Sequence, residues 1–426
     1  MKTIKASQIE GPSDRSTFIA LMVLTALVLA WRAPELLVKP QFWAEDGAIF
    51  FAQQHGQAWP HLFMPYWGYL HFIPRSIAWL SDLFAVKHTP ILYGLFSLAI
   101  DAACIAYVAR RVGLLYSPLV VWLSLTFIPN DGLYTGYIQN IQWFTQFVIV
   151  ALCLVPGGSS SNRTGGRIAA CIALAMCSLT GPFSAIVAIL CIAIFIAAKI
   201  PSVLFPWQAA FRAYWNELYK DRIFVVILCA VVQLVVAASS PTGDQLLLPS
   251  GKLLRNAFGQ WPQDHFFGVT LLPSGLFLLL VAGGLTLLLR SRKISNEQKI
   301  LSVALLAMAI AELLLGTTKP GAMGPGMMGG DRYYLIGKTG AWWAVTLLAI
   351  HYSPKKGHAI LATAAAIFAI AALNPQWMRR APLPDLDWRS QADSISAGQE
   401  TMLRINPGWW DKRAVIPARV VDKKAQ

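Results

Sequence analysis

The chain has 426 residues, of which 56% are hydrophobic and only 13% carry a charge. This composition excludes an ordinary soluble globular domain and is typical of a polytopic membrane protein. The formal charge of +14 does not indicate a nucleic-acid partner, because Lys and Arg form short clusters between apolar runs and no nucleic-acid-binding motif is present. The six cysteines lie in apolar segments without metal-binding spacing.

Apolar runs predict membrane-spanning helices, because about 20 apolar residues cross ~30 Å of hydrocarbon. The predicted spans are residues 17–36, 90–109, 114–129, 138–156, 168–181, 183–198, 223–239, 270–289, 300–316, 335–351 and 358–373. Thr180-Gly181-Pro182 separates two short runs, so a broken helix pair is possible there. We expect an all-α polytopic membrane protein with about eleven transmembrane helices in residues 1–373.

The first long loop, residues 37–89, contains a stretch that resembles a further span, Tyr69 to Phe84. Its apolar residues recur at spacings of three and four, and Arg75 lies off that stripe. This pattern is typical of an amphipathic helix in the membrane interface. A spanning helix would also bury Arg75 at a cost of ~2.5–3.5 kcal/mol. We therefore predict an interfacial helix here.

Basic residues assign the two sides of the membrane. With the N-terminus in the cytoplasm, the cytoplasmic loops and N-terminus carry about twice as many Lys and Arg as the opposite loops, as the positive-inside rule requires. The tail, residues 374–426, then lies outside. We expect a multi-pass protein of the bacterial inner membrane, with the first loop and the tail in the periplasm.

The polar motifs all fall in the predicted external loops. They are WAEDG (residues 43–47), NDGLYTGYIQN (130–140), LTGPFS (179–184), GQWPQDHFFG (259–268) and KPGAMGPGMMGGDRYY (319–334). The cytoplasmic loops are short and basic by comparison. This distribution predicts an external active or binding face, to which nucleotide-activated donors made in the cytoplasm have no access.

An acidic pair in the first external loop, an interfacial helix after it and further external loops late in the chain resemble the GT-C superfamily of integral-membrane glycosyltransferases. The resemblance implies a GT-C-like helical bundle and a sugar donor carried on polyprenyl phosphate. It also implies that Asp46 or Glu45 is the catalytic carboxylate and that Arg332 contacts the lipid phosphate. Asp131 matches an acidic residue that some relatives add to a metal site.

The residues suggest how such a transfer would proceed. The attacking hydroxyl must lose a proton, and we expect Asp46 to accept it, with Glu45 orienting the acceptor or carrying a metal. Arg332, with Lys319 or Lys338, would stabilise the leaving phosphate. The acceptor would be a periplasmic or lipid-linked glycan, and one inverting displacement is the simplest course. A divalent cation, Mg²⁺ or Mn²⁺, would bind Asp46 and Asp131 if a metal takes part.

Other external side chains are candidate substrate contacts. They are Arg75, Trp43, Asp131, Asp264, His265 and Tyr333. Simpler roles stay open for several candidates: a helix N-cap for Asp46, a turn for Asp131, and an interfacial aromatic belt for Arg332. Asp101 falls in the middle of a predicted span, and the sequence does not identify its partner.

Two other functions compete with glycosyl transfer. A transporter or flippase of an anionic lipid-linked intermediate would concentrate ionisable groups inside the membrane, whereas this chain offers only Asp101 and Glu312 there, without a clear internal repeat. An O-antigen-type ligase or polymerase would share the polar external loops but centre its chemistry on a large late loop. The sequence does not identify the sugar or the acceptor.

Overall fold

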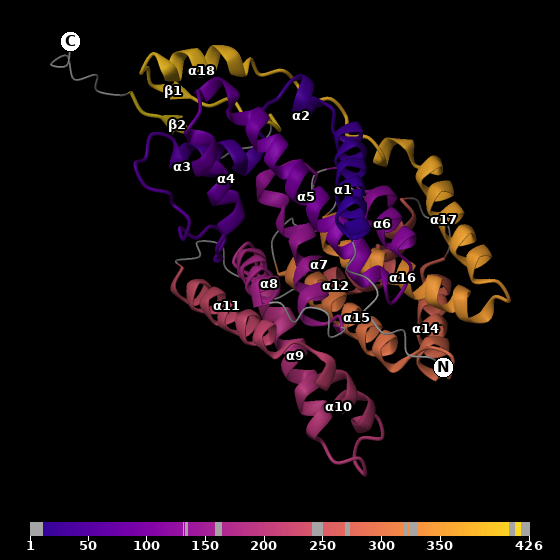
Figure 1. The fold of residues 1–426 in the computed structure, drawn as a ribbon. Helices are drawn as coiled ribbons and strands as arrows, with labels where there is room; N and C mark the ends of the chain where they lie inside the picture. The colour runs from indigo at the N-terminus through magenta and orange to yellow at the C-terminus, as the bar shows by residue number, and fades with distance from the viewer. Residues whose placement is uncertain are drawn as a thin grey trace.

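The computed structural model describes residues 12–130, 132, 135–157, 164–240, 250–268, 273–318, 323, 330–408 and 414–418. Regular structure in these ranges is helical, apart from one pair of two-residue strands. Figure 1 shows a bundle of long helices with shorter elements at both ends.

Each predicted span corresponds to one helix. The helices are α1 (Pro12–Arg32), α5 (Thr89–Gly113), α6 (Pro118–Phe127), α7 (Gln142–Cys153), α8 (Thr164–Ser178), α9 (Phe183–Lys199), α11 (Lys220–Ser239), α14 (Ser274–Arg290), α15 (Asn296–Thr317), α16 (Leu335–Tyr352) and α17 (Lys356–Leu373). Within the described ranges, five segments are long and apolar enough to cross a membrane: those of α1, α5, α11, α15 and α17. The expectation of an all-α polytopic membrane protein is confirmed. The predicted break near Gly181 lies between α8 and α9.

The connecting segments hold the shorter elements. They are α2 (Glu35–Val38), η2 (Asp46–Phe51), α3 (Ala52–Gln54), α4 (Phe72–Asp82), η3 (Val86–His88), η4 (Ile138–Asn140), α10 (Gln208–Glu217), α12 (Gly251–Arg255), η6 (Asn256–Gln260), α13 (Pro262–Phe267), η7 (Asp331–Tyr334), η8 (Pro375–Trp377), α18 (Trp388–Ser396), β1 (Thr401–Met402) and β2 (Val415–Ile416). In Figure 1, α10 and the N-terminus lie at one end of the bundle, whereas α3, α4 and α18 lie at the other. This separation agrees with the predicted sides. Which end faces the cytoplasm stays a prediction.

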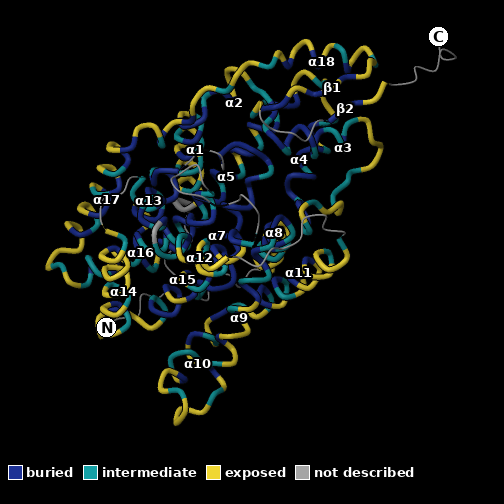
Figure 2. Tube along the Cα trace, turned by 180° about the vertical axis from the view of Figure 1, so that it is seen from behind, coloured by how far each residue is buried: buried dark blue, intermediate teal, exposed yellow. Residues whose placement is uncertain are grey.

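The outer surface of the bundle is apolar. Figure 2 shows exposed segments along α11, α14 and α17 around a buried centre. Large side chains such as Phe224, Leu279 and Leu361 are more than half exposed on these helices. An apolar surface of this kind suits contact with lipid, because acyl chains replace water around membrane helices.

Two predicted spans, 114–129 and 138–156, form shorter helices than expected. α6 has 10 residues and α7 has 12, so neither reaches the ~20 residues that a full crossing needs. Proline limits α6 at both ends, since Pro118 begins the helix and Pro129 follows its last turn. The described residues of the connection between the two helices, 128–130, 132 and 135–141, are largely buried. We call this connection the second external loop.

The predicted interfacial helix is present as α4, whose 11 residues span only ~16 Å. The expected orientation was wrong in one respect. Arg75 is completely buried, whereas apolar Leu80 and Phe84 are 37% and 56% exposed. The guanidinium of Arg75 lies over the ring of Phe50, 5.0 Å from its centroid. α4 packs against the first loop, so the face that the spacing predicts to be polar and exposed is buried at Arg75.

The C-terminal tail completes a second hydrophobic core with the first external loop. The ring of Phe42 lies 4.9 Å from Phe51, 5.4 Å from Tyr93 and 4.7 Å from Trp388, measured between centroids. The indole N–H of Trp388 donates to the carbonyl of Lys87 at 3.2 Å. The tail and the first loop therefore lie at the same end of the bundle.

We expect Trp388→Ala to destabilise the protein by about 3–5 kcal/mol, because it opens a cavity among buried aromatic rings. The change should lower the unfolding temperature of the detergent-solubilised protein. Trp59→Ala is the matched control, since Trp59 lies in the first external loop and is 81% exposed. Equal unfolding temperatures for the two variants would contradict this account of the core.

Candidate active site

The carboxylate of Asp46 binds the second external loop. The N–H groups of Ile138 and Gln139 donate to its two oxygens, each at 3.2 Å, and only 2% of Asp46 is exposed. Burial raises the pKa of Asp46 well above its usual range; the nearby Glu45 adds to that rise, and the two N–H groups oppose it. Asp46 therefore caps η4 rather than its own helix, in which no side-chain cap bond is formed.

Glu45 is the more accessible member of the acidic pair, with intermediate exposure beside Asp46. Its charge reaches Tyr66, whose pKa is raised first by burial and then by Glu45. The preceding residue, Ala44, has φ 38°, in the left-handed region that residues with a Cβ rarely adopt. Its N–H donates to the carbonyl of Asn406 in the tail, and this bond holds the turn in place.

Three further charged side chains bind the second external loop from other segments. Asp101 in α5 accepts the N–H of Gly136 at 3.4 Å, which identifies the partner that the sequence left open. Lys338 in α16 donates to the carbonyl of Pro129 at 3.0 Å. Arg380 in the tail donates to the carbonyl of Thr135 at 3.2 Å. Gly136 adopts φ +78°, and a Cβ there would overlap Leu36.

The same loop connects the acidic pair to the late loop that carries Arg332. Trp43, three residues before Asp46, stacks on Tyr137 with ring centroids 5.2 Å apart. At the start of α7, Trp143 meets the edge of Tyr333 at 5.3 Å. Arg332 directly precedes Tyr333 and is half-buried. One short segment, η4 and the first turn of α7, therefore contacts both the segment of the acidic pair and the loop that carries Arg332.

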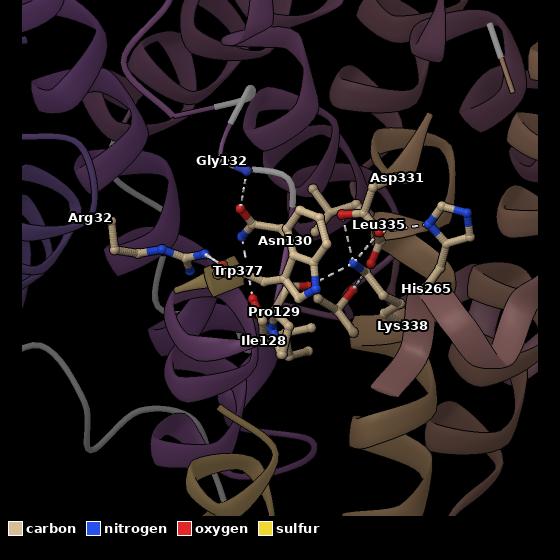
Figure 3. A network of polar contacts seen from close by, with 11 residues as sticks. Arg32, Ile128, Pro129, Asn130, Gly132, His265, Asp331, Leu335, Lys338 and Trp377 are labelled. Atoms are coloured by element: carbon tan, nitrogen blue, oxygen red, sulfur yellow. Dashed lines mark hydrogen bonds and ion pairs between the residues drawn. The ribbon is translucent and has the colours of Figure 1, made fainter. Parts of the chain in front are cut away.

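A buried polar network fixes the late loop (Figure 3). The ammonium of Lys338 lies 2.7 and 2.8 Å from the two carboxylate oxygens of Asp331, and His265 Nδ1 lies 2.9 Å from one of them. The His265 ring stacks on Tyr334 at 3.9 Å. Burial alone would raise the pKa of Asp331, but Lys338 and His265 hold it below its usual value. His265 is thus a buried hydrogen-bond partner of Asp331 and does not lie free in a solvated loop.

The remaining predicted residues are placed as follows. Lys319 and Asp131 lie outside the described residues. Asp264 is half-buried in α13, next to His265. Asn130 accepts the N–H of Gly132 at 2.8 Å, which is the turn that the sequence Asn130-Asp131-Gly132 predicts.

The described ranges contain no group of three or more His, Cys, Asp or Glu side chains that could hold a metal ion. Each Asp46 oxygen accepts one backbone N–H group. A role for Mg²⁺ or Mn²⁺ at Asp46 and Asp131 stays a prediction, and no chemical step below depends on it.

The sequence analysis missed two residues that the structure brings to the site. Arg380 forms a buried ion pair with Glu35 and lies over the ring of Tyr137, 4.2 Å from its centroid. No signal in one sequence pairs side chains 345 positions apart. Asp331 could have been found, because Lys338 follows it by two helical turns and so lies on the same face.

Contacts join the described residues of several polar motifs. Asp46 contacts the second external loop, Lys338 joins that loop to Asp331, and Asp331 contacts His265. The LTGPFS motif contacts α4, because the hydroxyl of Thr180 accepts the N–H of Ile73 at 3.1 Å.

No known family profile matches the sequence, and no curated protein matches it. Among solved structures, the chain is similar to ArnT from Cupriavidus metallidurans bound to undecaprenyl phosphate, with a TM-score of 0.46, 12% identity, and coverage of 89% of this chain and 69% of that chain. It is also similar to the archaeal oligosaccharyltransferase AglB from Archaeoglobus fulgidus in complex with an inhibitory peptide and a dolichol-phosphate. That likeness has a TM-score of 0.45 and 13% identity, and covers 89% of this chain and 58% of that chain. Both likenesses are distant, and the function proposed below is argued from the chain's own residues.

We expect Asp331→Asn to destabilise the protein by about 3–5 kcal/mol at neutral pH, because it leaves Lys338 buried without its counter-charge. A carboxylate with a lowered folded pKa stabilises the fold above its unfolded pKa of about 4 and loses that effect as pH falls. The difference between Asp331→Asn and the parent protein should therefore shrink at acid pH.

Unfolding in detergent at pH 7 and at pH 3 measures this difference. Asp393→Asn, at an exposed position in α18, serves as the control and should match the parent protein at both pH values. A variant Asp331→Asn as stable as the control at pH 7 would show that the network contributes nothing.

Proposed function

We propose that the protein is a membrane glycosyltransferase that moves a sugar from a polyprenyl-phosphate carrier to a glycan or lipid-linked acceptor. The proposal rests on one observation: a single short segment contacts both the acidic pair and the late loop. The acidic pair and the late loop with Arg332 both rest on η4 and the start of α7. A base and a phosphate-binding cation held at one end of the bundle are the two groups that this transfer needs.

Glu45 is the proposed general base. Asp46 is buried with an N–H donor on each oxygen, whereas Glu45 is half-exposed on the adjacent position. From the sequence we expected Asp46 to be the base, with Glu45 orienting the acceptor or carrying a metal. In the proposed arrangement Asp46 is a positioning residue, which orients Glu45 by fixing η2 against the second external loop.

Arg332 is the proposed phosphate-binding residue. Its guanidinium lies 5.5 Å from the ring centroid of Tyr333, and Tyr333 is held against Trp143. Lys338, proposed from the sequence for the same role, would act indirectly, because its ammonium binds Asp331 and thereby fixes the loop. Lys319 remains a second candidate cation from the same loop.

The reaction would be one displacement at the anomeric carbon. Glu45 takes the proton of the acceptor hydroxyl as its oxygen forms the new glycosidic bond. The bond between the anomeric carbon and the phosphate oxygen breaks, and the phosphate leaves as an anion beside Arg332. Attack opposite the leaving group inverts the anomeric configuration. The polyprenyl tail stays in the bilayer, so the reacting atoms belong at the membrane boundary.

The proposed setting is the periplasmic side of a bacterial inner membrane. The excess of Lys and Arg in the predicted cytoplasmic loops supports this side. A flippase for an anionic lipid-linked intermediate is the main alternative, since Asp101 and Glu312 are buried within α5 and α15. Asp101 already binds the N–H of Gly136, which favours a structural role for it. An O-antigen-type ligase remains the other alternative.

Replacement of Glu45 by Gln should lower transfer by about 10²–10⁴-fold, because a positioned general base contributes that much. The unfolding temperature should stay unchanged. Asp46→Asn should lower both transfer and unfolding temperature, since its amide nitrogen would face a backbone N–H. Proteoliposomes supplied with undecaprenyl-phosphate-linked glucose, galactose and arabinose, with membrane glycolipid as acceptor, measure the transfer.

Glu400→Gln is the matched control, because Glu400 is exposed in the tail. Full transfer by Glu45→Gln combined with loss in a stably folded Asp46→Asn would return the base assignment to Asp46. Movement of the lipid across the bilayer without any transfer by the parent protein would replace the enzyme with a flippase.

A further inference from the structure

A cavity of about 220 Å³ opens where the end of α1, the second external loop and residues 376–383 of the tail meet. A single water needs only ~10–15 Å³ of such space, so the cavity has room for a polyatomic ion with bound water. Three arginines line it, namely Arg32, Arg379 and Arg380. None of the residues predicted to bind the donor phosphate belongs to this cavity.

Arg380 adds a buried positive charge to the cavity wall. Its side chain is only 5% exposed, and it binds Glu35 and the carbonyl of Thr135. Its Nη2 has no hydrogen-bond partner in the described part of the chain. Nη2 is closed off from the cavity, as is the unpaired Oε2 of Glu35, so Arg380 contributes charge to the wall and not an open donor.

Arg379 supplies a second cation that is free to bind. It is exposed and has no hydrogen bond or ion pair within the described ranges. Arg32 adds a third positive charge and holds the wall together, because its guanidinium donates to the carbonyls of Thr126 and Trp377 at 2.5 and 3.1 Å. Figure 3 shows the bond from Arg32 to Trp377. Glu35 is a carboxylate that pairs with one of these arginines, Arg380.

The cavity lies beside the ends of two helices. α1 ends at Arg32 and α17 ends at Leu373, so the cavity follows the ends of two helices suited to membrane crossing. Trp43 and Trp377 line it, and tryptophan is enriched at this depth of a bilayer. A ligand with a charged head could enter from the interface while its tail stays in lipid.

We propose that this cavity is a phosphate-binding site for the headgroup of an anionic lipid or for free phosphate, separate from the site proposed around Arg332. Arg379 binds the phosphate oxygens, since a guanidinium group matches that geometry in a bidentate manner, and Arg32 and Arg380 lie in the wall around it. The inference concerns binding alone and does not rest on the proposed glycosyl transfer.

Arginine footprinting tests the site directly. The detergent-solubilised protein is treated with phenylglyoxal, and modification of Arg379 is followed by mass spectrometry with Arg389 as the exposed control on α18. The probes are farnesyl phosphate, a short-chain phosphatidylglycerol and inorganic phosphate, with farnesol as the uncharged control. We expect the phosphate-bearing probes to protect Arg379 and to leave Arg389 reactive.

The probes separate the sources of the phosphate. Protection by the two lipids only identifies a headgroup site, and protection by inorganic phosphate as well identifies a site open to soluble anions. Protection by none of the probes, equal protection by farnesol, or equal protection of Arg389 would overturn the proposal.

A variant series gives a second readout. Ligand binding raises the unfolding temperature, so the probe concentration that produces a given rise reports affinity. We expect Arg379→Gln to require about tenfold more probe, as for loss of one charge-assisted contact. Arg389→Gln should behave like the parent protein. A response of Arg379→Gln that matches the control would overturn the site. No sugar donor is present, so absence of transferase activity leaves this result unaffected.

Discussion

The backbone of the second external loop sets the main constraint on this structure. Its residues enter the bundle as irregular chain, where peptide N–H and C=O groups have neither water nor a helix to bond with. Charged side chains from four separate segments supply the missing partners: Asp46, Asp101, Lys338 and Arg380. Because the cost of an unpaired buried group is high, these four segments must meet at the loop.

This constraint explains why residues so distant in sequence form one site. The first loop reaches the second through Asp46, the late loop through Lys338 and its partner Asp331, and the tail through Arg380. Each contact satisfies a backbone group and also fixes the segment that carries it. The buried charged residues therefore have a structural role, and more exposed residues close to them are the candidates for chemistry. Asp46 is enclosed while Glu45 stays accessible, and Lys338 is enclosed while Arg332 stays half-exposed.

Hydropathy predicted the helical segments, because it depends on local composition, whereas the sides assigned from the distribution of charge stay a prediction. Residue spacing predicted α4 but misplaced Arg75, since an apolar stripe marks one packed face and does not show that the other face is packed too. The Arg380–Glu35 pair and the burial of His265 depend on how distant helices pack. Neither follows from one sequence without knowledge of that packing.

The tail has a consequence for how the protein matures. Trp388 fills the core beneath the first loop, and Asn406 binds the backbone on either side of Trp43. Both residues leave the ribosome after every membrane helix has been synthesised. The acidic pair therefore reaches its final geometry only when the late part of the chain has packed against the first loop. Synthesis of the last membrane helix comes before completion of this end of the bundle.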